Sequence, residues 1–86
     1  MPTIKCDPFY FLAKKYGFRS RAAFKLIELE KKYKILKNSN GIVDLCAAPG
    51  SWVQVANKIS PLASLIIGID AQKIRPIKGC YFLRSD

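Results

Sequence analysis

The feature that most constrains this chain is an apolar run that stops at a Pro-Gly pair and passes at once into a helical pattern. The run is IVDLCA at 42–47, Pro49-Gly50 interrupts it, and apolar residues recur at helical spacing over 51–59. A second apolar run, SLIIGID, follows at 64–70. Short apolar runs of this kind are typical of buried parallel strands. A strand, a helix and a second strand in this order predict an α/β layer fold.

The flanking segments extend this prediction on both sides. On the C-terminal side, a basic, proline-containing connection leads to a third predicted strand at 80–86. On the N-terminal side we expect a short helix at 8–16 and a longer helix at 21–37, which the hydroxyl of Ser20 would cap. Because a doubly wound sheet normally has more than three strands, the pattern predicts only the N-terminal half of such a fold.

We expect residues 1–86 to form part of a single domain, with basic helices at 8–37 and a cofactor-binding β-α-β-β unit at 41–86. The two main helices each have apolar residues at steps of three and four, which predicts one buried stripe per helix. The predicted stripes are Ala22, Leu26, Leu29, Tyr33 and Leu36 in the first helix and Trp52, Val55, Ala56 and Ile59 in the second.

Positive charge is concentrated in the N-terminal segment. The net charge is +9, and residues 1–40 carry ten lysines and arginines against three acids. Such a field favours a polyanionic partner, most often nucleic acid. A solvated, lysine-rich surface is the alternative that composition alone leaves open.

The composition also bears on membranes and metals. The longest apolar run, LIIGI at 65–69, is far shorter than the roughly 20 residues that span a bilayer. The start, MPTIKCDPF, lacks the apolar block of a secretory signal, so we expect an intracellular chain without a membrane partner. Three cysteines and no histidine provide fewer than four zinc ligands, which predicts reduced thiols and no metal site.

An aspartate lies at or near the end of each predicted strand. Asp44 lies near the end of the first strand, Asp70 ends the second and Asp86 ends the third. Ligands of open α/β sheets bind beyond the carboxyl ends of the strands, so these side chains are expected to share one crevice. Three carboxylates repel a phosphate and suit a ligand that has hydroxyl groups, an amino group and positive charge.

The loop at Pro49-Gly50 narrows the choice of ligand. Gly50 leaves room for a ligand against the backbone, and Pro49 fixes the loop. Asp70 follows at about the offset at which a carboxylate binds a ribose diol. The G-x-G-x-x-G loop of nicotinamide cofactors is absent, so we expect an adenosine-like ligand without phosphates, S-adenosylmethionine above all. Alternatives stay open for single residues, with Asp44 as a helix-dipole partner and Trp52 as a core residue.

Four motifs in a fixed order resemble those of a known family. RSRAAFKL (19–26), VDLCAAPGSW (43–52), IIGID (66–70) and SD (85–86) resemble the FtsJ-like ribose 2′-O-methyltransferases. Within that family the chain is most similar to the eukaryotic nucleolar branch that acts on the precursor of large-subunit ribosomal RNA. The resemblance implies a Rossmann-like methyltransferase fold that uses S-adenosylmethionine, of which this chain has the N-terminal half.

The resemblance also implies roles for individual residues. Lys25 matches the first lysine of a catalytic Lys-Asp-Lys-Glu set, whose other members would lie beyond residue 86. A cation there lowers the barrier because it favours the oxyanion of the attacking ribose 2′-hydroxyl. The predicted cofactor-binding residues are Asp44, Pro49, Gly50, Trp52, Asp70 and Asp86, with Gly50 and Trp52 at the methionine part, Asp70 at the ribose or beside the adenine, and Asp86 at the adenine amino group.

RNA is the predicted partner. Arg19, Arg21 and Lys32 surround Lys25 in the sequence and are the candidate RNA contacts. By its resemblance the chain would methylate ribosomal RNA precursor in pre-ribosomal particles, in the nucleolus of the nucleus, with the cytoplasm as the alternative. Two other functions stay open, namely methylation of the transfer RNA anticodon loop and a non-catalytic RNA-binding role in ribosome assembly. Because the rest of the catalytic set is expected beyond residue 86, we expect this chain alone to be inactive.

Overall fold

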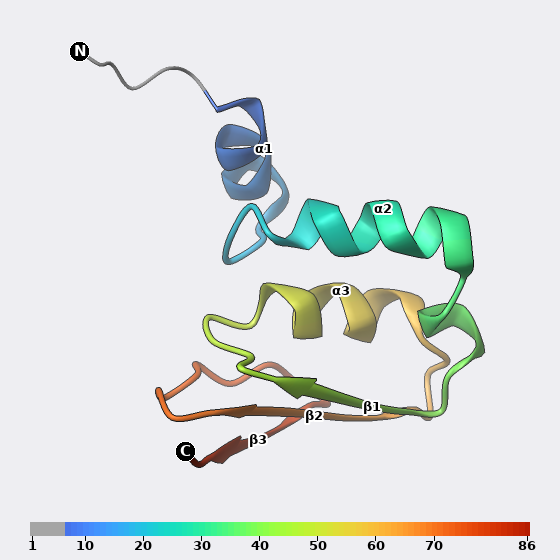
Figure 1. Cartoon of the computed structure of the whole chain (residues 1–86), viewed down its shortest axis with the longest axis vertical. Coiled ribbons are helices and arrows are strands. Elements are labelled where there is room, and N and C mark those ends of the chain that lie inside the picture. Colours follow the sequence, from blue (N-terminus) through green and yellow to red (C-terminus); the bar gives the residue numbers. More distant parts are fainter. Residues whose placement is uncertain (1–6) are drawn as a thin grey trace.

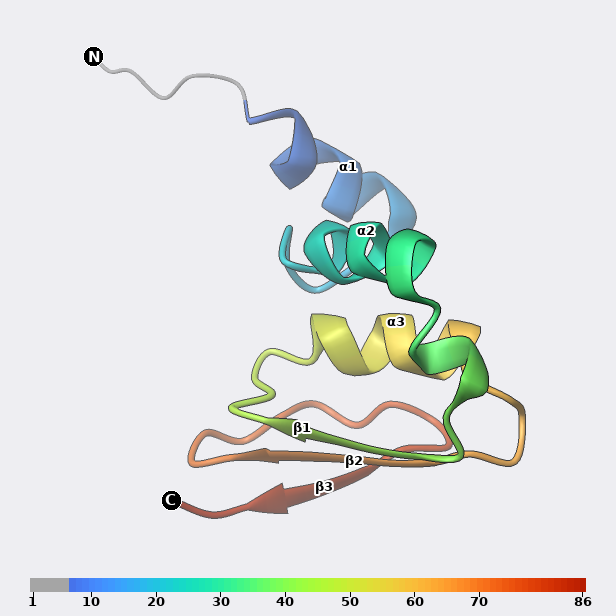
Figure 2. The same ribbon diagram turned by 45° about the vertical axis from the view of Figure 1, so that its right-hand side comes forward.

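The structure is a layered stack of helices on one parallel sheet (Figure 1). A computed structural model describes residues 7–86. The elements in chain order are α1 (Pro8–Tyr16), α2 (Ala23–Tyr33), the 3-10 turn η1 (Leu36–Asn38), β1 (Gly41–Leu45), α3 (Ser51–Ile59), β2 (Leu65–Asp70) and β3 (Tyr81–Arg84). In both views α3 covers one face of the sheet, α2 packs on α3, and α1 is the outermost layer (Figures 1 and 2). The predicted α/β fold is therefore confirmed.

Within residues 7–86, no helix has the length and apolar character that crossing a membrane requires.

The sheet has the order β1-β2-β3, and both neighbouring pairs are parallel. β1 pairs with β2 along its whole length. β2 pairs with β3 from Ile67 opposite Tyr81 to Asp70 opposite Arg84. The carboxyl ends of the strands therefore lie at the same edge of the sheet. Within residues 7–86, β1 has a strand neighbour on one side only.

α3 is buried on two sides because it lies between the sheet and α2. Val53, Val55 and Ala56 of this helix are all buried, and Ile66 of β2 is buried in the same core. The predicted stripe is right for Val55 and Ala56 and wrong for Trp52, which is 38% exposed. A stripe drawn at helical spacing assumes one buried face, whereas a helix between two layers buries residues on both sides.

α2 ends before the predicted boundary at residue 37. Lys34 adopts the left-handed conformation, with φ of 54°. The carboxylate of Glu30, a buried residue, accepts hydrogen bonds from the backbone N–H of Leu36 at 2.7 Å and of Lys37 at 3.0 Å. These two bonds hold the backbone of η1 as a separate turn, so the last predicted helical turn is not part of α2.

The start and the buried face of α2 also differ from the prediction. Ser20 does not cap the helix, because Ala22 occupies the N-cap without a side-chain hydrogen bond and the Ser20 hydroxyl bonds to that of Ser51 at 2.7 Å. Ala22 and Tyr33 were expected inside, yet both are exposed, and Ala23 is fully buried. The side of α2 that packs on α3 is thus turned by about one residue from the predicted stripe.

Gly68 allows two other segments to approach the middle of β2. A Cβ atom at this position would lie 2.7 Å from the ring of Phe82 and 3.0 Å from the Cβ of Ala47. Phe82 belongs to β3 and Ala47 to the loop after β1, so the missing side chain brings both onto the central strand. This contact holds the loop that forms the candidate site.

We predict that Gly68→Ala lowers the free energy of unfolding by about 1–3 kcal/mol, because the added methyl group overpacks the contact with Phe82 and Ala47. Gly41→Ala is the matched control, since it changes another strand glycine at which an added Cβ meets no atom within 4 Å. Urea unfolding followed by circular dichroism measures both variants. An equal loss of stability in the two would contradict the packing explanation.

Candidate functional site

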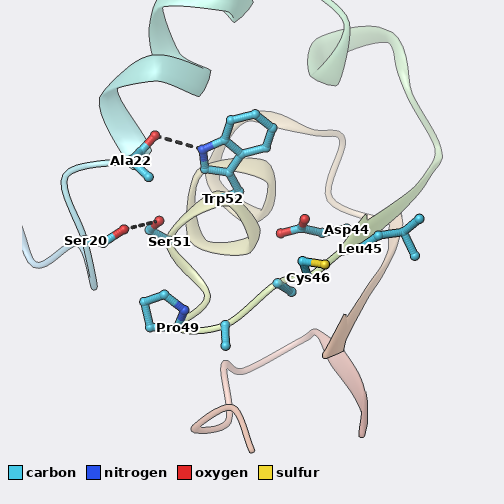
Figure 3. Close-up of a pocket in the computed structure, with 10 residues that line it drawn as sticks. Ser20, Ala22, Asp44, Leu45, Cys46, Pro49, Ser51 and Trp52 are labelled. Carbon is cyan, nitrogen blue, oxygen red and sulfur yellow. Dashed lines mark hydrogen bonds between the residues drawn. The ribbon is translucent and has the colours of Figure 1, made fainter. Parts of the chain in front are cut away.

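A pocket of about 310 Å³ opens at the carboxyl end of β1 (Figure 3). Its floor is Asp44 and the loop that follows β1, and the start of α3 and the segment before α2 complete its wall. Ligands of open α/β sheets bind at this place. The lining residues used below are Ser20, Asp44, Cys46, Pro49, Ser51 and Trp52.

Trp52 covers the pocket from the side of α3. Its indole Nε1 donates a hydrogen bond to the carbonyl oxygen of Ala22 at 2.8 Å (Figure 3). The bond holds the ring between the start of α2 and Asp44, so the ring lines the pocket in place of packing in the core. Trp52 is therefore a partly exposed residue of the pocket lining and not a buried core residue, and its contact with a cofactor stays a prediction.

Asp44 lies in the floor of the pocket. Its carboxylate lies beneath the Trp52 ring, while the neighbouring Leu45 side chain points away from it (Figure 3). Within residues 7–86, no hydrogen bond or ion pair engages this carboxylate. Burial raises its pKa, and the nearby charge of Asp70 raises the pKa further. A half-buried acceptor of this kind favours a ligand that offers a cation or N–H and O–H donors.

Asp70 has the opposite environment. Its Oδ1 accepts a hydrogen bond from the N–H of Gln72 and its Oδ2 accepts one from the N–H of Ala48, both at 2.9 Å. These backbone donors, Gln72 first and then Ala48, lower the pKa of Asp70. Asp70 therefore holds the pocket loop from behind and is not among the residues that line the pocket. Its contact with a ribose stays a prediction.

Gly50 is required by the fold itself. Its φ is +112°, a left-handed backbone value that residues other than glycine rarely adopt. A Cβ atom there would lie 3.1 Å from Nη1 of Arg19 and 3.4 Å from the Ile74 side chain. Gly50 therefore provides the positive φ that the loop needs, and Arg19 and Ile74 fill the space where its side chain would lie. Contact of Gly50 with a ligand stays a prediction.

Arg19 connects three segments behind the pocket. Its Nη1 donates to the carbonyl oxygens of Pro49 at 3.0 Å and Arg75 at 2.6 Å, and its Nη2 donates to that of Pro76 at 3.0 Å. Desolvation lowers the pKa of Arg19, and the charge of Arg75 lowers it further. The side chain thus has a structural role that the sequence did not suggest, and its contact with RNA stays a prediction.

Lys25 does not line the pocket that contains Asp44 and Trp52. It lines a separate hollow of about 280 Å³ between α1 and α2, together with Phe9, Arg21, Phe24 and Glu28. There the Lys25 ammonium lies 3.2 Å from the Glu28 carboxylate, and the Arg21 guanidinium lies 2.8 Å from that of Asp7. The other candidate RNA contact, Lys32, has its ammonium 5.3 Å from the centroid of the Tyr33 ring.

Two further observations complete the site. Asp86 is exposed beyond β3 and does not line the pocket, so the structure brings only Asp44, Pro49 and Trp52 of the predicted cofactor set into its lining. Ser20 and Cys46 line the pocket and were missed, although both lie within the quoted motifs.

Among residues 7–86, no cluster of three His, Cys, Asp or Glu residues is placed to bind a metal ion.

Comparison with known proteins assigns the chain to a family. The family described as FtsJ-like methyltransferase matches residues 18–86. The chain belongs to the FtsJ-like methyltransferase family. The resemblance seen in the sequence motifs is thereby confirmed.

Individual relatives of this FtsJ-like chain are similar over most of its length. A pre-rRNA 2′-O-ribose RNA methyltransferase of Dictyostelium discoideum is 52% identical over 82 residues, which are 95% of this chain and 10% of that protein. The pre-rRNA 2′-O-ribose RNA methyltransferase FTSJ3 of Gallus gallus is 51% identical over 80 residues, which are 93% of this chain and 10% of that protein. The chain thus spans about a tenth of the length of these relatives.

A solved structure supports the fold assignment. The crystal structure of a ribosomal RNA methyltransferase of Plasmodium falciparum superimposes with a TM-score of 0.71 at 44% sequence identity. The match covers 80% of this chain and 38% of that one. The FtsJ-like chain therefore has part of the Rossmann-like methyltransferase fold, as the sequence predicts.

We predict opposite effects of neutralising the two strand-end acids. Asp44 has a folded-state pKa above the ordinary aspartate value, so its ionisation costs stability as the pH rises from that value through the folded pKa. Asp70 has a folded-state pKa below the ordinary aspartate value, so its contribution is present above that value and is lost as the pH falls through the folded pKa. At neutral pH, Asp44→Asn should raise the free energy of unfolding and Asp70→Asn should lower it.

Urea unfolding over a pH series measures both effects. The gain from Asp44→Asn should shrink as the pH falls toward the ordinary aspartate value, and the loss from Asp70→Asn should shrink at still lower pH. Changes of the same sign at neutral pH would show that the environments of the two carboxylates have been assigned wrongly.

We also predict that Arg19→Lys lowers the free energy of unfolding by about 1–3 kcal/mol, because lysine replaces the two bonding nitrogens, Nη1 and Nη2, by one ammonium on an unbranched chain. Arg75→Lys makes the same chemical change at an exposed position and should have little effect. Thermal or urea unfolding of the two variants is the measurement. Equal stability of Arg19→Lys and the wild type would remove the structural role given to this side chain.

Proposed function

We propose that this chain is the S-adenosylmethionine-binding part of an RNA ribose 2′-O-methyltransferase that acts on ribosomal RNA precursor. The pocket beside Asp44 is the observation that carries this proposal, because a half-buried carboxylate without a partner among residues 7–86 suits a ligand with positive charge. Relatives named as pre-rRNA 2′-O-ribose RNA methyltransferases and as an AdoMet-dependent rRNA methyltransferase, the last from Schizosaccharomyces pombe, support the substrate and the cofactor.

The residues of the pocket fit S-adenosylmethionine. Asp44 would accept from the amino group or lie near the positive charge of the methionine part, and Trp52 would cover that part of the ligand. Pro49 and Gly50 would shape the loop beside it, while Asp70 and Asp86, which lie outside the pocket lining, would bind the ribose and the adenine from the ends of the neighbouring strands. When bound, this cofactor supplies an electrophilic methyl group for transfer.

Lys25 would act on the substrate side of the reaction. Its ammonium would favour the oxyanion that develops on the attacking 2′-oxygen. In the structure it pairs with Glu28, but both side chains are largely exposed, and exposed pairs contribute little to stability. The lysine can therefore leave this pair when RNA approaches. A carboxylate, a second lysine and a glutamate from other parts of the protein would complete the set.

The proposed setting is a pre-ribosomal particle in the nucleolus of the nucleus. The names of the relatives favour ribosomal RNA precursor over transfer RNA as the substrate. The concentration of lysine and arginine in the N-terminal helices supports an RNA partner, because basic surfaces bind the phosphate backbone. Arg21 and Lys32 are the contacts proposed from this segment, with Arg19 held mainly by its backbone bonds.

Isothermal titration calorimetry with S-adenosylmethionine tests the cofactor assignment. We expect the wild-type chain to bind and Asp44→Asn to bind at least about tenfold more weakly, because the variant loses a charge-assisted contact. Wild-type binding should also weaken as the pH falls through the raised pKa of Asp44. Glu28→Gln, which removes a carboxylate from the separate hollow, should bind like the wild type. Absence of binding by the wild-type chain would reject the assignment.

Transfer of a labelled methyl group separates the possible RNA substrates. A longer form that contains the remaining catalytic residues should methylate ribosomal RNA precursor in preference to transfer RNA, and Lys25→Met should abolish that transfer. The 86-residue chain should show no transfer to either RNA. Methylation by this chain alone would contradict the role given to the missing residues.

A further inference from the structure

The outer face of α1 has an unusual composition for an exposed helix surface. We use this name for Tyr10, Phe11, Lys14 and Lys15, which pair at i and i+4 on the same side of the helix. The opposite side carries Ala13, which is buried, and also Phe9, whose ring packs on a phenylalanine of α2. α1 is the layer farthest from the sheet (Figure 2), and all four residues of its outer face are exposed.

The two aromatic rings of this face are held in place but not covered. Tyr10 is 47% exposed and Phe11 is 57% exposed. Their ring centroids lie 5.2 Å apart in an edge-to-face arrangement, and the ammonium of Lys14 lies 5.1 Å from the centroid of the Tyr10 ring. Adjacent exposed aromatic rings do not help this helix pack on α2, so the fold alone gives no reason for them.

The lysines of the outer face also lack acidic partners in the described part of the chain. The ion pairs found within residues 7–86 join Arg21 to Asp7 and Lys25 to Glu28. Residues 1–6, MPTIKC, contain no Asp or Glu that could neutralise Lys14 or Lys15. The positive charge of this face is therefore available to a polyanion, whereas Arg21 and Lys25 must first give up a carboxylate.

We propose that the outer face of α1 binds single-stranded RNA, with Tyr10 and Phe11 stacking on bases and Lys14 and Lys15 contacting phosphates. Exposed aromatic rings beside cations form the usual platform for unpaired nucleotides, because every base has a face on which a ring can stack. Bases in a duplex are already stacked and do not offer these faces. The choice of RNA as the polyanion rests on the proposed function, and the single-stranded form rests on the geometry of the helix.

Fluorescence anisotropy with a labelled oligouridylate and a labelled RNA duplex tests this proposal on the 86-residue chain. Tyr10→Ala combined with Phe11→Ala should weaken binding to the single strand by about tenfold or more, and Tyr10→Phe should change it by less than about twofold. Lys14→Gln combined with Lys15→Gln should lower the slope of log affinity against log salt concentration by about 1.4. Duplex binding should be weaker and nearly insensitive to loss of the rings.

Tyr81→Ala is the matched control, because Tyr81 is 64% exposed but lies on β3 rather than on α1. Circular dichroism checks that all variants stay folded. Equal weakening by Tyr81→Ala, unchanged affinity after loss of both α1 rings, or tighter binding of the duplex would each overturn the proposal. So would binding to anionic phospholipid vesicles without binding to the oligouridylate.

Calorimetry with S-adenosylmethionine separates this proposal from the proposed function. The α1 variants should bind the cofactor like the wild type, since their side chains lie outside the pocket. A chain that binds RNA through α1 but does not bind the cofactor would reject the proposed function alone. If the chain binds the cofactor but the α1 substitutions leave its RNA affinity unchanged, only the proposal for the outer face of α1 is rejected.

Discussion

Docking of the segment at 17–20 against the start of α3 is the interaction on which the pocket depends. The Gln54 side chain accepts from the N–H of Arg19 at 2.7 Å and donates to the carbonyl of Gly17 at 3.0 Å. The Arg19 guanidinium then reaches past Gly50 to the backbone at 75–76. One stretch of chain therefore fixes the basic helices, the pocket loop and the connection before β3 relative to one another. The segment at 17–20 therefore both holds these parts of the chain together and, through Ser20, lines the pocket.

Element types could be predicted from the sequence because they depend on local patterns. The apolar runs became β1 and β2, and the Pro-Gly loop placed the pocket at the correct strand end. Burial was harder to predict, because it depends on how many layers contact a helix. For this reason Trp52, which was part of the predicted stripe, is partly exposed, whereas Val53, which was not, is buried. The roles of Gly68 and Glu30 were also missed, since each arises from contacts to residues that the local pattern does not connect.

The strand-end aspartates show the same limit for the candidate site. From sequence, Asp44 and Asp70 are equivalent acids at the ends of neighbouring strands. In the structure, backbone N–H groups stabilise the charged form of Asp70. Burial and the like charge of Asp70 destabilise the charged form of Asp44. The difference depends on the path of the loop at 46–49, which approaches Asp70 and leaves Asp44 facing open space. The strand pattern predicted that both acids lie near strand ends, and the loop geometry determined that only Asp44 lines the pocket.

The hydrogen bond between Trp52 and Ala22 makes the fluorescence of this tryptophan sensitive to the pocket and to the contact with α2. The chain contains one tryptophan, so its intrinsic emission at long excitation wavelengths comes from a single indole. That indole is partly exposed, faces the pocket and is tied through Nε1 to the segment before α2. Any event that fills the pocket or separates α2 from α3 changes the polarity around the same fluorophore. Ligand titrations and unfolding can therefore be followed on the native side chain, without attaching a label.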